Sequence, residues 1–79
     1  FNMEMRLRYF GQLQEATGKK EEVLTDSFES LGNLRDFLLK RYPKLNHVHF
    51  KMAQNNKIDI DSSPLRGNLI DLLPPFSGG

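Results

Sequence analysis

The polar side chains that could do conventional chemistry are few and scattered. His47 and His49 have a spacing that would point both rings the same way from a strand, but no convincing carboxylate or thiol partner accompanies them as a metal ligand. Asp59 and Asp61 share that spacing and fit a solvated turn better than a general base. The serines have no Ser-His-Asp pattern around them, and the absence of cysteine excludes disulfides and a thiol nucleophile. The body of the chain therefore predicts no active site of its own.

The ending "LLPPFSGG" is the part of the sequence best suited to chemistry. Pro74 and Pro75 cannot donate ladder hydrogen bonds, so they end the preceding strand and hold the chain extended. Gly78 and Gly79 have no Cβ and can pass through a slot too narrow for other residues. We expect residues 76–79 to form a flexible tail that reaches at most about 17 Å and carries one reactive group, the α-carboxylate. A frayed terminus or a linker is the alternative interpretation.

Alternating apolar residues predict the strand that begins the domain. In "MEMRLRYF" every second residue is apolar, which is the period of a half-buried strand. Phe10 breaks the rule, because its parity puts it on the polar face. The stretch "QLQEATG" predicts a short helical turn closed by Gly18, and "EEVLTDSF" predicts a second strand. We expect the two strands to pair as a hairpin.

The stretch "SLGNLRDFLLKRYP" predicts the main helix. Ser30 is a suitable N-cap, and Pro43 stops the helix. One stripe at helical spacing contains Leu31, Leu34, Phe37, Leu38 and Tyr42. This amphipathic stripe predicts that the helix covers one face of a sheet.

The remaining elements predict an α+β fold. "HFKMAQ" and "KIDI" are short strands joined by a turn at "NN", and "LIDLL" is the last strand. The element order matches the ubiquitin-like β-grasp, a mixed β-sheet covered on one face by one main helix, with the first and last strands central. We expect one domain over residues 1–75, followed by the tail. The predicted core contains Met5, Leu7, Tyr9, Val23, Leu34, Leu38, Met52, Ile70 and Leu72.

Composition limits the classes of partner. The 79 residues include 11 basic and 10 acidic side chains, a net charge of +1. This balance gives no general attraction to nucleic acid or to an anionic membrane. No apolar run is long enough to span a bilayer and no signal peptide is visible, so we expect a cytoplasmic protein that binds neither nucleic acid nor membrane.

Four stretches of the sequence carry a family resemblance. They are "YFGQLQEATG", "AQNNKI", "PLRGN" and "LLPPFSGG", and between them they span the chain. With these motifs the chain resembles the MoaD/ThiS family of ubiquitin-like sulfur carriers. Its Pro-Pro-x-x-Gly-Gly ending suits the small subunits of molybdopterin synthase better than the carriers of the thiamine pathway.

The resemblance implies a sulfur-donating subunit that is not catalytic by itself. An adenylating enzyme related to ubiquitin-activating enzymes (MoeB-type) would use ATP and Mg²⁺ to activate Gly79, and a sulfur donor protein would then leave a thiocarboxylate there. The large subunit of molybdopterin synthase (MoaE-type) would receive the tail and pass the sulfur to a pterin precursor in molybdenum cofactor biosynthesis. No cofactor is expected on this chain.

An apolar surface beside the tail is the expected docking site for partners. In a β-grasp, Phe10 and Leu73 would be neighbours on the face away from the helix, and the family's pattern adds Ile58. Scattered exposed apolar residues are the alternative. The expected partner interface comprises Phe10, Ile58, Leu73, Pro74, Pro75, Phe76 and Ser77, with Gly78 and Gly79 as the reacting end.

Three other functions remain open at this point. A ubiquitin-like modifier would join the same terminus to a lysine through an isopeptide bond. A thiamine-pathway sulfur carrier would share the activation chemistry but serve a thiazole-forming partner. A pure interaction domain would not use its terminus at all.

Overall fold

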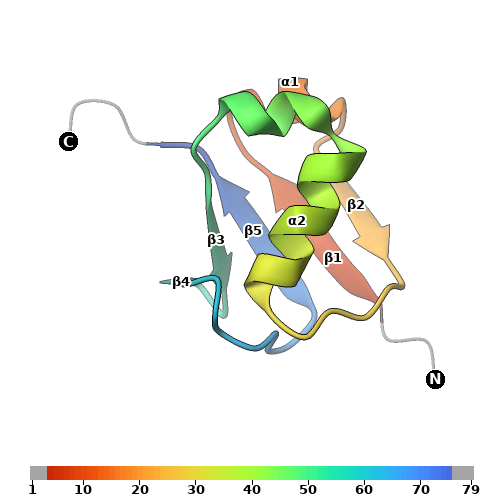
Figure 1. Cartoon of the computed structure of the whole chain (residues 1–79), viewed down its shortest axis with the longest axis vertical. Coiled ribbons are helices and arrows are strands. Elements are labelled where there is room, and N and C mark those ends of the chain that lie inside the picture. Colours follow the sequence, from red (N-terminus) through yellow and green to blue (C-terminus); the bar gives the residue numbers. More distant parts are fainter. Residues whose placement is uncertain (1–3, 76–79) are drawn as a thin grey trace.

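Five strands form one mixed sheet, with the main helix across one face (Figure 1). The computed structural model describes residues 4–75, so residues 1–3 and 76–79 lie outside the described part of the chain. The strand order is β2-β1-β5-β3-β4, with the first and last strands of the sequence in the middle, as predicted. The strands are β1 (Met5–Tyr9), β2 (Glu21–Leu24), β3 (Lys51–Gln54), β4 (Lys57–Asp59) and β5 (Leu69–Leu73).

The pairing of the central strands fixes where the tail leaves the domain. β1 and β5 are parallel, while β1–β2, β3–β4 and β3–β5 are antiparallel. The carboxyl ends of β1 and β5 therefore lie together at one end of the sheet, where Figure 1 places the exit of the C-terminal segment. The β3–β4 hairpin turns at Asn55 and Asn56, whose φ angles of 55° and 62° confirm the turn that "NN" predicts.

Two α-helices and one 3₁₀ helix complete the fold. α2 (Leu31–Arg41) begins at the predicted cap, where the Ser30 hydroxyl accepts a hydrogen bond from the Asn33 N–H at 3.2 Å. α1 (Gln12–Thr17) ends at Gly18 in the left-handed region, also as predicted. The sequence analysis did not predict the 3₁₀ helix η1 (Pro43–His47). In residues 4–75, neither α-helix is long and apolar enough to cross a membrane.

The core lies between α2 and the sheet and confirms most of the predicted positions. Leu7, Leu34, Leu38 and Leu72 are fully buried. The core is larger than the sequence predicted, because α1 and η1 each contribute a fully buried leucine. The buried apolar residues that the prediction omitted are Leu13, Leu24, Leu31, Leu45, Phe50 and Ala53.

The prediction that Val23 belongs to the core is wrong. Val23 is 48% exposed, whereas Leu24 is 4% exposed. The antiparallel register pairs Met5 with Leu24 and Leu7 with Glu22, and paired residues share a face of the sheet. Two adjacent apolar residues of β2 cannot both face inward, and the register selects Leu24.

The same register turns the Glu22 carboxylate toward the helix-covered face, where a polar network surrounds it. Its Oε2 accepts hydrogen bonds from the hydroxyls of Tyr9 and Tyr42, the latter at 2.6 Å. Lys19 and Arg41 place nitrogens 3.7 Å and 3.9 Å from its Oε1. Burial raises the pKa of Glu22, but the tyrosine hydrogen bonds and the two cations outweigh burial, so the pKa lies below its ordinary value.

We expect Glu22→Gln to make the unfolding free energy less dependent on pH in acidic solution. A depressed carboxyl pKa contributes stability above the ordinary value of 4.5, and that contribution is lost as pH falls through the folded-state pKa. The parent should therefore lose unfolding free energy below about pH 5 more steeply than the variant, as measured by urea titration. Glu15→Gln, on the exposed face of α1, is the matched control. Parallel curves for parent and Glu22→Gln would contradict the network's role.

Candidate functional site

The tail begins where β5 ends, beside the end of β1. Leu73 is the last residue of β5, and the Phe10 N–H donates to the Leu72 carbonyl at 3.2 Å, which extends the parallel pairing past the end of β1. Pro74 follows and is half-buried, and Pro75 is exposed. The first turn of α1 begins at Gly11, whose carbonyl accepts a hydrogen bond from the Gln14 N–H at 3.0 Å. Gly11 lies next to Pro74. The base of the tail therefore rests on the loop between β1 and α1.

Gly11 is the contact that supports Pro74. Its φ of 58° and ψ of −135° belong to a backbone conformation that essentially only glycine adopts. A Cβ built on Gly11 would lie 3.0 Å from the Cγ of Pro74. Glycine therefore permits both the turn out of β1 and the close approach of the proline ring. The sequence analysis did not predict this contact, because it spans 63 residues of sequence.

The predicted interface residues lie on two flanks of the end of β5. Ile58 and Leu73 line one groove together with Pro74 and Pro75. Phe10 lies on the other flank, where it is 38% exposed. The structure thus brings four of the candidates together in one groove and places the fifth, Phe10, beside the end of β5, where its N–H donates to the Leu72 carbonyl.

An ion pair that the sequence analysis missed borders the Phe10 flank. Arg8 donates from Nε and from a terminal nitrogen to the two carboxylate oxygens of Asp71, at 2.6 Å and 2.9 Å. The hydrogen bond and the charge of Asp71 raise the pKa of Arg8, whose guanidinium carbon lies 5.7 Å from the centre of the Phe10 ring. The sequence placed Arg8 and Asp71 at outward-facing positions of the two central strands, and this was the signal from which the pair could have been predicted. The outer face of the sheet, which is the face away from α2, therefore carries apolar side chains and one ion pair, Arg8–Asp71, whose charges cancel.

The described residues form no metal site. Within residues 4–75, no cluster of three histidine, cysteine or acidic side chains could hold a metal ion. His47 ends η1, and His49 lines the groove beside the tail. The remaining candidates, Phe76, Ser77, Gly78 and Gly79, lie outside the described residues, as does the predicted flexibility of the tail. What the described residues offer is a supported exit for the chain at Pro74, with apolar side chains on either side of it.

Solved structures share this architecture. The chain aligns with a putative molybdopterin converting factor, subunit 1, from Pyrococcus furiosus, with a TM-score of 0.81, 17% identity, and 94% of this chain and 99% of that chain covered. It aligns with the small archaeal modifier protein 1 from Methanosarcina acetivorans with a TM-score of 0.74, 25% identity and 96% of each chain covered. These likenesses confirm the ubiquitin-like β-grasp fold.

A third solved structure comes from an assembly. It is the complex of subunits 1 and 2 of molybdopterin-converting factor from Helicobacter pylori, with a TM-score of 0.64, 28% identity, and 98% of this chain and 100% of that chain covered. The model of the ThiS family matches residues 7–79, nearly the whole chain. The chain therefore belongs to the ThiS family, within the ThiS/MoaD group of ubiquitin-like sulfur carriers.

Proposed function

We propose that this protein is the small, sulfur-carrying subunit of molybdopterin synthase, and that it carries sulfur on the carboxyl group of Gly79. The observation that supports this most directly is the family match, which runs through the Gly-Gly ending and is joined by likeness to a chain from a two-subunit molybdopterin-converting factor. The described site agrees with this role, because Gly11 supports Pro74 at the point where the chain leaves the sheet.

The proposed chemistry begins with an unreactive carboxylate. An α-carboxyl group has a pKa of about 3.5, so at neutral pH it is an anion and a poor electrophile. A carboxylate oxygen would attack the α-phosphorus of ATP on a separate adenylating enzyme, which supplies Mg²⁺, and pyrophosphate would leave. A sulfur donor protein would then deliver sulfur at the oxidation level of sulfide to the acyl carbon, the bond from that carbon to the AMP oxygen would break, and a thiocarboxylate would remain. Because the sulfur is held on the terminus, the carrier needs no cysteine of its own.

The large synthase subunit is the proposed recipient of the tail. Its active site would enclose the last residues and bring the thiocarboxylate to the pterin precursor. Glycine at the last two positions suits a narrow channel, since neither residue has a Cβ. The carrier would then act as a consumed and regenerated co-substrate of the complex.

A modifier function is the second candidate, because the small archaeal modifier protein 1 shares the fold at 25% identity. Both functions need the same activated terminus and differ in the nucleophile that attacks it: a sulfur donor for a carrier, or a lysine amine for a modifier. The thiamine pathway is a third candidate with carrier chemistry but another acceptor. These alternatives predict different covalent products.

Intact-mass spectrometry distinguishes these functions. The chain is incubated with an adenylating enzyme, ATP, Mg²⁺ and a sulfur donor, and then with the large subunit and the pterin precursor. We expect one oxygen of the chain to be replaced by sulfur, and that sulfur to be lost only when the large subunit and precursor are both present. A covalent adduct with lysines of other proteins would instead establish the modifier, and sulfur transfer only to a thiazole-forming enzyme would establish the thiamine carrier.

The outer face supplies a further prediction about docking. We expect Phe10→Ala or Leu73→Ala to weaken binding to the large subunit by about tenfold or more, because each removes apolar contact area beside the tail. Val23→Ala is the matched control, since Val23 is exposed on the opposite edge strand β2. Calorimetry that gives both variants the affinity of the parent would remove this surface from the interface.

A further inference from the structure

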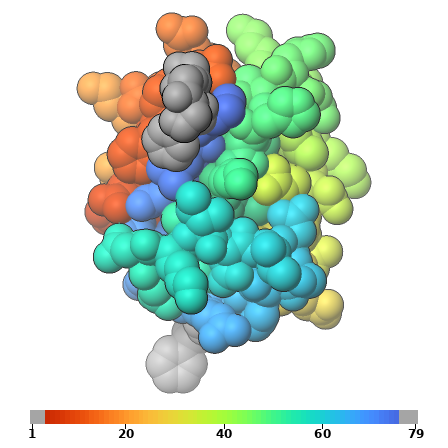
Figure 2. Space-filling view, turned by 90° about the vertical axis from the view of Figure 1, so that its left-hand side faces the viewer, coloured from red at the N-terminus to blue at the C-terminus, as the bar shows by residue number. Residues whose placement is uncertain are grey.

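A groove runs beside the base of the tail and is not explained by the chemistry of the terminus. It has a volume of about 700 Å³ and lies between α2, η1 and the start of β3. We call it the β3 groove and define it by Leu39, Leu45, His49, Phe50, Lys51 and Pro75. Figure 2 views the molecule from the side on which β3 and β4 lie.

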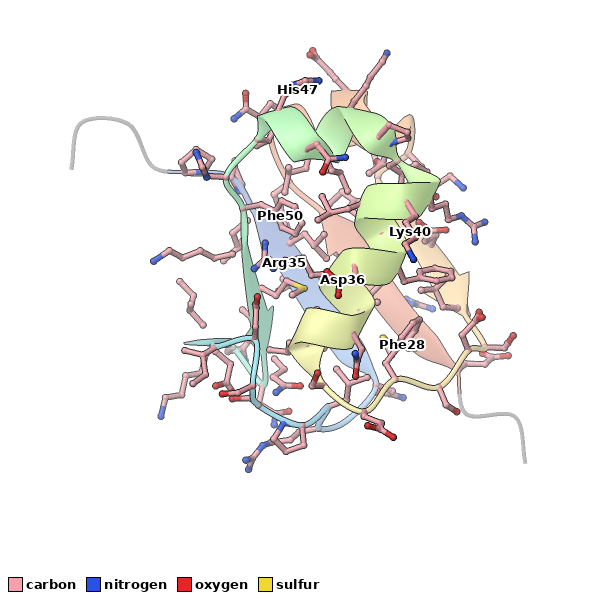
Figure 3. The ribbon with its side chains drawn as sticks, viewed as in Figure 1. Phe28, Arg35, Asp36, Lys40, His47 and Phe50 are labelled. Carbon is pink, nitrogen blue, oxygen red and sulfur yellow. The ribbon has the colours of Figure 1, made fainter. Side chains whose placement is uncertain are left out.

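The floor of the β3 groove is apolar and held in place. Leu45 and Phe50 are buried in the core, with Leu39 half-buried beside them. Arg35 lies over the Phe50 ring, 4.5 Å from its centre, and donates to the Phe50 carbonyl at 3.0 Å (Figure 3). Arg35 also donates to Asp61 at 3.1 Å, so its side chain is fixed from two sides. A fixed apolar floor of this size suits the burial of a large apolar side chain.

One wall of the β3 groove is a strand edge without a neighbour among residues 4–75. Lys51 pairs with Leu73 of β5 on one side, but the pairing of β3 with β4 begins only at Met52. β4 therefore stops short of the start of β3. An extended segment that continued along β4 would pair with the backbone of Lys51, the first residue of β3, in the mode by which peptides add to sheet edges.

The charges around the β3 groove have one sign. The residues with basic side chains that line it are Arg35, His49 and Lys51, and no acidic residue is among its described lining. Asp61 compensates the charge of Arg35, so the exposed ammonium of Lys51 is left as the dominant charge at the rim. A carboxylate on the occupant would complement it.

We propose that the β3 groove binds an extended segment of the large synthase subunit, which places a large apolar side chain on the floor and a carboxylate beside Lys51. This inference rests on the proposed function, because the tail must enter that partner. The β3 groove shares Pro74 and Pro75 with the base of the tail, so a partner that encloses the tail necessarily reaches it. The segment anchors the carrier beside the channel and adds affinity that the glycines cannot supply.

Charge reversal with a matched control tests the proposal. Affinity of the full-length chain for the large subunit is measured by calorimetry for the parent, Lys51→Glu and Lys40→Glu. Lys40 is an exposed lysine of α2 that does not line the β3 groove. We expect Lys51→Glu to weaken binding about tenfold and to reduce its dependence on salt, with Lys40→Glu close to the parent.

Crosslinking then locates the segment. Because the chain has no cysteine, Lys51→Cys or Lys40→Cys provides a single thiol for a photo-crosslinker. Capture of one large-subunit peptide with an acidic and a large apolar residue, from position 51 alone, supports the proposal. If the parent binds and Lys51→Glu binds equally well, the β3 groove is not the anchor while the proposed function stands. If the parent does not bind the large subunit at all, both proposals are overturned.

Discussion

Removal of Gly79 is expected to abolish sulfur transfer while leaving the fold intact. One residue of extended chain spans about 3.5 Å, so the shortened terminus places its acyl carbon that far from the reacting groups. Productive attack tolerates misplacement of only about 1 Å, and an error of that size already costs about 100-fold in rate. We therefore expect no detectable thiocarboxylate by intact mass, or no transfer of sulfur from any that forms.

Gly78→Val tests the channel separately from the length of the tail. The variant keeps every backbone atom but adds a branched side chain where the proposed slot has room for none. It should fail in transfer as the shortened chain does. Both variants should unfold at the same urea concentration as the parent, because neither glycine has a side chain that could contribute to the hydrophobic core. A shortened protein that supported dithiolene formation at the parent's rate would eliminate the terminal carboxyl group as the carrier.

The parts of the fold that could be predicted are those in which the local residue pattern agrees with the tertiary packing. In β1, strict alternation left one apolar face available, and the structure buries it. The Ser30 side chain caps the helix, and Asn55 and Asn56 adopt the positive φ angles of the turn. The helix start and the hairpin turn therefore followed from the residue types in the sequence. The prediction for Val23 was wrong because β2 contains two adjacent apolar residues and only one of them can face inward. Only the register with β1 decides which one does.

The candidate site was predictable in its residues but not in its arrangement. The tail and its prolines were evident from the loss of hydrogen-bond donors, which is a local property. The Arg8–Asp71 pair and the support of Pro74 by Gly11 each join residues 63 apart in the sequence. The β3 groove depends on η1, which the sequence analysis did not predict. These features follow from pairing β1 with β5 and from how far β4 extends, which no single stretch of sequence encodes.

The close approach of Pro74 to Gly11 provides the second large effect. Gly11→Val is expected to push Pro74 aside, since the new Cβ would lie 3.0 Å from the proline Cγ and the β-branched residue would resist a φ of 58°. We expect a loss of about 1–3 kcal/mol in unfolding free energy from backbone strain. We also expect sulfur transfer to fall by about 100-fold in protein that remains folded, because the tail enters its channel displaced.

Gly18→Val separates strain from displacement. Gly18 has a φ of 78°, and a Cβ there would meet nothing within 4 Å. This variant therefore introduces the strain of a left-handed backbone without a clash with Pro74. It should lose stability and keep its rate of sulfur transfer. Combining Gly11→Val with Pro74→Ala removes the nearest clashing atom and should restore part of the transfer rate but not the stability lost to strain. If Gly11→Val and Gly18→Val lose stability alike and both transfer sulfur at the parent's rate, Gly11 shapes the turn after β1 without directing the tail.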